Sequence, residues 1–150
     1  MTVHLRKLCV GVANIQEMQD WQKLRLKSEG KLYHRTRNTP KRQDELLDGG
    51  SIYWITKGKI LVRQRIIGFE RQEAEDVIQA DPEKPAKPHC LILLDPVLVA
   101  VEPRPHKIFQ GWRYFDDDDV PPDISQASQN AIDDLGHEFA EELRHVGIVI

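Results

Sequence analysis

The chain has 150 residues, of which 40% are hydrophobic and 30% are charged, and both values are usual for one globular domain. No apolar run approaches the roughly 18 residues that a membrane-spanning helix needs, and the first residues lack the apolar region of a signal peptide. We therefore expect a single soluble, cytoplasmic domain with its own core and no contact with a membrane.

Charge is divided unevenly along the chain. Residues 1–65 carry 14 Lys and Arg against 6 Asp and Glu, whereas residues 66–150 carry 7 against 18. Such segregation is found in proteins that present a basic surface to nucleic acid or that carry an acidic tail. It is equally compatible with two halves that neutralise each other in the fold.

The first predicted elements are a strand and a helix. Nearly alternating apolar residues predict a strand at 3–10. Asn14 and Glu17 have the spacing of a capping box, so a helix is expected to run from there to about Ser28 and to end at Gly30. The residues expected to face the core are Ile15, Met18, Trp21 and Leu24 or Arg25.

Shorter elements follow. Residues 32–36 predict a strand, and Thr39, which precedes a proline, is expected to cap a short helix that ends at Gly49. The β-branched and aromatic segment 51–56 and the segment 59–69 predict two strands of a hairpin around a Lys-Gly turn.

The second half of the chain begins with a change in composition. Residues 71–88 are rich in acidic residues and proline and predict a mobile loop. Strands are expected at 89–94, 97–101 and 108–115, followed by a helix over about 125–145. This order of elements favours an α+β fold with a largely antiparallel sheet or small β-barrel, flanked by two longer helices and one short helix.

No segment matches an established catalytic or metal-binding motif. Cys9 and Cys90 lie in apolar, strand-like stretches and are expected to be buried free thiols, and no cofactor or metal site is expected. A small hydrolase or nuclease is an alternative, with its acidic or histidine groups drawn from Glu45, Asp95, Glu102 or His106. A further alternative is an adaptor protein that uses the acidic C-terminal helix.

Three groups of basic residues carry the functional prediction. In the hairpin, Arg63 and Arg65 are two residues apart and therefore share a face, beside aromatic residues of the preceding strand. A second group surrounds the start of the short helix, where backbone N–H groups favour anions, and a third mixes cations with aromatic rings over 104–114. Arginine pairs with phosphate, and aromatic rings stack on bases. The residues expected to contact nucleic acid are Lys41, Arg42, Trp54, Arg63, Arg65, Arg104, Trp112 and Arg113.

Several segments carry a family resemblance. They are HLRKLCVG at 4–11, PKRxxELLxGGSxYW at 40–54, RQR at 63–65, LDP at 94–96, and EPRP through FQGWRY at 102–114. In identity and order they resemble a bacterial family, found mainly in alphaproteobacteria, that is described as a domain of unknown function (DUF1489). This resemblance implies no established activity.

A second likeness is to PUA-like barrels, including the ASCH and EVE groups. A short helix at 41–47, a strand, a Lys-Gly turn and a second strand at 60–68 are similar in arrangement to those folds. The likeness implies a protein that binds RNA or a modified base. We therefore predict a non-catalytic nucleic-acid-binding module whose partner is RNA or another single strand, with arginines and lysines on phosphate and Trp54 and Trp112 stacked on bases.

Overall fold

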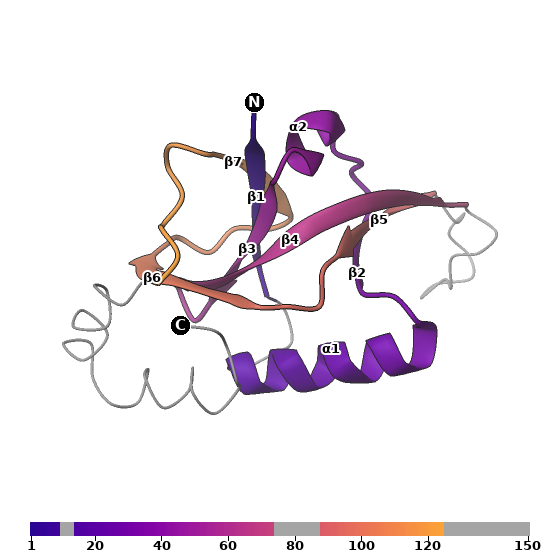
Figure 1. The fold of residues 1–150 in the computed structure, drawn as a ribbon, viewed down its shortest axis with the longest axis horizontal. Coiled ribbons are helices and arrows are strands. Elements are labelled where there is room, and N and C mark those ends of the chain that lie inside the picture. Colours follow the sequence, from indigo (N-terminus) through magenta and orange to yellow (C-terminus); the bar gives the residue numbers. More distant parts are fainter. Residues whose placement is uncertain (10–13, 74–87, 125–150) are drawn as a thin grey trace.

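The computed structural model describes residues 1–9, 14–73 and 88–124 (Figure 1). In this part of the chain seven strands form a mixed sheet that is accompanied by two helices. The elements are β1 (Val3–Leu8), α1 (Ile15–Glu29), β2 (Tyr33–Thr36), α2 (Gln43–Leu47), β3 (Ser51–Thr56), β4 (Lys59–Gln72), β5 (His89–Leu94), β6 (Val99–Pro105) and β7 (Trp112–Asp116).

The strand order is β2-β5-β4-β3-β1-β7, and β6 pairs with β4. The pair β1–β3 is parallel, and the other pairs are antiparallel. The long strand β4 connects the two halves of the sheet, because its first half pairs with β3 and β6 and its second half with β5. The expected α+β fold is confirmed. The end strands β2 and β7 do not pair among the described residues, so the sheet is not closed into the barrel that was the other expectation.

Local signals account for the hairpin and for the ends of α1. Lys57 and Gly58 both have positive φ, 51° and 76°, as a two-residue turn between right-twisted strands requires. The Asn14 side chain accepts a hydrogen bond from the Glu17 N–H at 2.8 Å, and Gly30 ends the helix with φ 74°. These three features were predicted from the sequence and are confirmed.

Helix α1 meets the sheet with a different set of residues from the one expected. Ile15 and Met18 are buried, but 57% of Trp21 and 68% of Leu24 are exposed. Gln22 faces the sheet instead, and its amide forms hydrogen bonds with the amide of Gln64 of β4. The prediction was therefore wrong for Trp21 and Leu24, whereas Arg25, the alternative to Leu24, is half-buried and donates to the Tyr33 carbonyl oxygen of β2.

Each face of the sheet carries its own hydrophobic cluster. Leu5, Ile52 and Trp54 belong to the larger cluster on the side of the helices, whereas Tyr53 and Phe115 belong to a smaller cluster on the opposite side. Successive strand residues point to opposite faces, so this division follows directly from the sequence positions. We call the first side the helix face and the second the arginine face.

Several element boundaries differ from the sequence expectations. Helix α2 begins after Arg42 without a side-chain cap, so Thr39 is not its cap. Strand β6 continues through its prolines to Pro105, because it lies at an edge where proline removes no needed donor. Most of the predicted mobile loop and the whole predicted C-terminal helix lie outside the described residues. Cys9 and Cys90 are free thiols, and none of the described helices is long and apolar enough to cross a bilayer.

Candidate nucleic-acid interface

Four side chains form a row across the arginine face. Arg63 of β4 pairs with Tyr53 of β3, Tyr53 pairs with Arg6 of β1, and Arg6 pairs with Arg113 of β7. Directly paired residues project from the same face of a sheet. Since neighbouring strands are about 4.8 Å apart, Arg6 and Arg113 are adjacent, and Arg63 lies about 10 Å from Arg6.

Neither Arg6 nor Arg113 forms an ion pair with the described residues. The Arg6 guanidinium lies 4.8 Å from the ring centroid of Phe115, and that of Arg113 lies 4.5 Å from the ring centroid of Phe109. Like charges directly opposite each other on paired strands are destabilising. Two arginines in this arrangement therefore form a local excess of positive charge that no carboxylate of residues 1–9, 14–73 and 88–124 neutralises.

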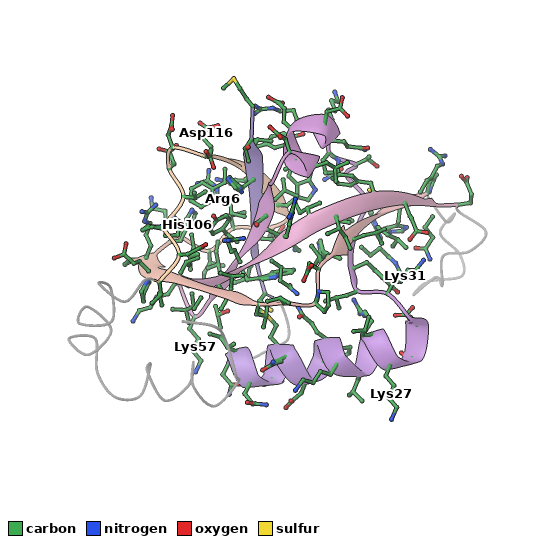
Figure 2. All side chains as sticks on the ribbon, in the orientation of Figure 1. Arg6, Lys27, Lys31, Lys57, His106 and Asp116 are labelled. Carbon is green, nitrogen blue, oxygen red and sulfur yellow. The ribbon has the colours of Figure 1, made fainter. Side chains whose placement is uncertain are left out.

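His106 orients Arg6 as a neutral acceptor. The His106 Nδ1 atom lies 2.8 Å from the Lys107 carbonyl oxygen, which can only accept, so Nδ1 carries the proton. The Nε2 atom is then free to accept from Nη1 of Arg6, at 3.2 Å. The Nε–H of Arg6 is buried and has no acceptor among the described residues, which is costly for a buried donor. Figure 2 shows Arg6 and His106 together, away from Lys27 and Lys31 beside α1.

A shallow hollow of about 410 Å³ adjoins this pair, between the end of β6 and the start of β7. It is lined by Pro105, His106, Lys107, Ile108, Phe109 and Arg113. Lys107 and Arg113 are exposed, and 65% of Ile108 is exposed beside them. We call Arg6, His106, Lys107, Phe109 and Arg113 the arginine patch.

The predicted residue Arg63 shares the arginine face, but a carboxylate neutralises it. Its guanidinium donates two hydrogen bonds of 2.7 Å to Asp123 and a third to the Ser51 hydroxyl at 3.0 Å. The hydrogen-bonded Asp123 carboxylate raises the pKa of Arg63 above its usual value. Arg63 is therefore a structural cation that holds the segment after β7 against the sheet.

Two further predicted residues lie on this face. Arg65 is exposed and lies opposite Ser51. Arg104 lies opposite Ile60 of the arginine-face cluster and donates to the Asp119 carbonyl oxygen. With Arg6, Arg63 and Arg113, the face gathers five arginines from four strands.

The two tryptophans expected to stack on bases lie on the helix face instead. Only 7% of Trp54 is exposed, and its indole N–H donates to Gln64 Oε1 at 2.8 Å. Trp112 donates to the Asn38 carbonyl oxygen at 2.9 Å and packs edge-on against Tyr114. Because one strand position separates Trp112 from Arg113, the two side chains point in opposite directions.

Lys41 and Arg42 also lie away from the arginine face. Their backbone N–H groups donate to the Tyr114 hydroxyl at 2.9 and 3.2 Å, respectively. The Arg42 guanidinium makes hydrogen bonds of 2.5 and 3.0 Å to Glu45, which raise the pKa of Arg42 and lower that of Glu45. The predicted common surface therefore does not form: Arg63, Arg65, Arg104 and Arg113 lie on the arginine face, and the other four residues lie away from it.

The buried residue His4 has the partners of a catalytic dyad, but neither of its ring nitrogens is free to accept a proton from a substrate. Its Nε2 atom lies 2.7 Å from Asp117 Oδ1, and its Nδ1 atom accepts from the Ser51 backbone N–H at 3.0 Å. Both ring nitrogens are therefore engaged, and no lone pair is left to take a proton from a substrate. The imidazole fixes β1 to β3 and to the acidic segment after β7.

Each of the groups considered for a hydrolase is already engaged in an interaction, Glu102 among them. Glu45 is bound to Arg42, Asp95 accepts from the Val97 backbone N–H at 2.9 Å, and His106 is bound to Arg6. Among residues 1–9, 14–73 and 88–124, no three His, Cys, Asp or Glu side chains are grouped to hold a metal ion. The acidic C-terminal helix proposed for an adaptor lies outside these residues.

Arg6 is the functional candidate that the sequence interpretation missed. It lies in a strand of otherwise mixed residues, and its neighbours in sequence give no sign of a site. Its partners, His106, Arg113 and Phe115, are about a hundred positions away. The pairing of β1 with β7 brings Arg113 and Phe115 to Arg6, and the end of β6, which pairs with β4, brings His106.

Comparison with known proteins agrees with the resemblance carried by the sequence motifs. A model of a family described as a protein of unknown function (DUF1489) matches residues 5–149. No curated protein and no solved structure matches the chain. The match covers nearly the whole sequence, and the chain belongs to the DUF1489 family.

Proposed function

We propose that this protein binds single-stranded nucleic acid, with RNA as the preferred partner, through the arginine patch. The observation that carries the proposal is the adjacency of Arg6 and Arg113, two guanidinium groups without a carboxylate partner in the described part of the chain. Phosphate is the ligand that such a pair fits best, because each guanidinium donates several hydrogen bonds in a planar fork.

The aromatic residues of the patch favour a single strand over a duplex. Phe109 is partly buried beneath the Arg113 guanidinium, and the exposed Ile108 lies next to it. Unpaired bases stack on such apolar and aromatic surfaces, whereas the bases of a duplex are already stacked on each other. The likeness of residues 41–68 in sequence to PUA-like folds is a further reason to propose RNA as the partner.

The acidic segment after β7 limits the site. Asp123 neutralises Arg63, and the Asp119 carbonyl oxygen engages Arg104. Arg6 and Arg113, which no carboxylate of the described residues pairs with, lie side by side at the β1–β7 end of the face. A strand bound there would run along the exposed ends of Arg113 and Lys107 and not across the whole sheet.

The test is binding of a fluorescein-labelled single-stranded RNA of about 12 nucleotides, a length within the usual range for one small domain. Anisotropy is measured from about 50 mM salt upwards, with Arg113→Gln as the test variant and Lys27→Gln as the charge-matched control. Both side chains are exposed, and Lys27 lies on α1, away from Arg6 (Figure 2).

We expect Arg113→Gln to weaken binding about tenfold at low salt and to reduce the slope of log K against log salt by about 0.7, the value for one lost phosphate contact on a single strand. Lys27→Gln should bind as the wild type does. Absence of binding by the wild type at about 50 mM salt, or equal losses in the two variants, would contradict the proposal.

A further inference from the structure

A second, partly open site lies between α1 and the helix face of the sheet. It has a volume of about 340 Å³, at the lower end of the range of about 300–1,000 Å³ that is usual for small-molecule sites. Four aromatic rings line it, those of Trp21, Tyr33, His34 and Trp54. The other lining residues are Lys7, Leu8, Cys9, Met18, Gln22, Arg25, Leu32 and Leu94.

Hydrogen bonds preform the wall of this cavity. Gln64 is fully buried, and its amide bonds reciprocally with Gln22, at 2.9 Å in both directions. The same amide accepts from Trp54 Nε1 at 2.8 Å and donates to the Asp95 carbonyl oxygen at 3.1 Å. All hydrogen-bonding positions of Gln64 are therefore used. This network fixes the Trp54 ring and the distance of α1 from the sheet before any ligand enters.

Lys7 supplies the cavity with an uncompensated charge. Its side chain is partly buried, and no carboxylate of the described residues pairs with it. Burial lowers the pKa of Lys7 from its usual value. A cation removed from water without a partner costs free energy that a bound anion would return.

A second cation, Arg25, lies at the same cavity but is already engaged. Nη1 donates to the Tyr33 carbonyl oxygen at 3.0 Å, and Nε lies 3.6 Å from the Glu29 carboxylate. The guanidinium also covers the Tyr33 ring, at 4.9 Å from its centroid. Arg25 therefore shapes the aromatic wall, and Lys7 is left as the cation available to a ligand.

The other polar groups of the cavity suit the binding of a ligand better than catalysis. Burial, with the nearby charges of Lys7 and Arg25, lowers the pKa of His34 to about 4, so its ring is neutral at pH 7. Burial raises the pKa of Cys9 to about 12, so the thiol stays protonated and is a weak nucleophile. His34 packs edge-on against Trp54, 5.9 Å between centroids.

We propose that this cavity binds a small aromatic molecule that carries one carboxylate or phosphate group, with Lys7 as its counter-ion. The rings of Trp54, Tyr33 and Trp21 provide stacking and edge contacts for a ligand of one or two fused rings. Lys7 provides the single charge that selects an anion. The site lies on the opposite face from the arginine patch, so the inference is independent of the proposed function.

The experiment is isothermal titration of the full chain with three probes: indole-3-carboxylate, adenosine 5′-monophosphate and octanoate. The first two are aromatic anions, one with a carboxylate and one with a phosphate group, and the third is an anion without a ring. Indole itself is the uncharged control. We expect at least one aromatic anion to bind with a Kd below about 1 mM, and indole and octanoate to bind at least about tenfold more weakly.

Lys7→Met should abolish most of this binding, with a loss of about tenfold or more, and Lys7→Gln provides a second variant in case the first alters the fold. Both should retain wild-type RNA binding, and Arg113→Gln should retain the aromatic anion. Absence of binding by all probes, tighter binding of octanoate, or unchanged affinity in both Lys7 variants would overturn the proposal.

Discussion

Replacement of His34 by glutamine should remove most of the acid sensitivity that this residue gives to the fold. The pKa of His34 is lowered from 6.5 to about 4 by burial and by the charges of Lys7 and Arg25. In the unfolded chain the ring takes up a proton as the pH falls below about 6.5, whereas in the folded protein it stays neutral until about pH 4. Protonation therefore favours the unfolded state over this window, and the stability of the fold decreases as the pH is lowered.

The magnitude follows from the separation of the two pKa values. Between pH 7 and pH 5 the His34 contribution to the free energy of unfolding should fall by about 2 kcal/mol, and by about 3 kcal/mol once pH 4 is reached. Above pH 7 it should not change, because the ring is neutral in both states. Other ionisable groups also titrate below pH 7, but they are common to the two proteins and cancel in the difference.

The assay is urea unfolding followed by far-ultraviolet circular dichroism at pH 7 and pH 5 for the wild type and His34→Gln. The wild type should lose about 2 kcal/mol more than the variant between these pH values. If the two proteins lose the same free energy, His34 has an ordinary pKa in the folded state, and the description of the cavity as a desolvated, cation-lined site is wrong.

Four further substitutions test other parts of the account by urea unfolding or RNA binding. Lys7→Met should raise the free energy of unfolding by about 1 kcal/mol, because it removes a partly buried cation that pairs with no carboxylate in the described part of the chain; a loss of stability would contradict that description. Gly50→Ala should cost about 3 kcal/mol or more, since a Cβ there would collide with the backbone oxygens of Val3 and Leu46, and a neutral effect would argue against this approach of α2 to β1. Asn14→Ala should cost about 1 kcal/mol through loss of the helix cap, whereas the exposed Lys27→Ala should cost less than about half as much. Asp123→Asn should free Arg63 and raise RNA affinity about two- to fivefold in anisotropy titrations, and unchanged affinity would place the RNA elsewhere.

The features predicted correctly from the sequence are those set by neighbouring residues. The Asn14 cap, the Gly30 stop and the Lys57-Gly58 turn each depend on the conformational preferences of a few adjacent positions. The strand at Ser51–Thr56 was predicted with its observed bounds. In each case, the physical cause lies within one turn of helix or one hairpin.

The features that could not be predicted depend on contacts between distant segments. Trp54 was expected to be available to a base, but its indole N–H donates to Gln64, and the bond of Gln64 to Gln22 becomes apparent only when α1 is placed on the sheet. Arg63 was expected to bind phosphate, and it is neutralised by Asp123, 60 positions later. Strand alternation placed Arg63 and Arg65 on one face correctly, but it carries no information about which strands become neighbours.

Crosslinking to RNA tests the central proposal most directly, because it reports which face the RNA touches. A single-stranded RNA that contains 4-thiouridine is irradiated in complex with the wild-type protein, and the crosslinked peptides are identified by mass spectrometry. We expect crosslinks at Phe109 and His106, on the arginine face, and their loss in Arg113→Gln. Crosslinks confined to the exposed residues of α1, such as Trp21, would show that the RNA binds on the opposite side and would contradict the account.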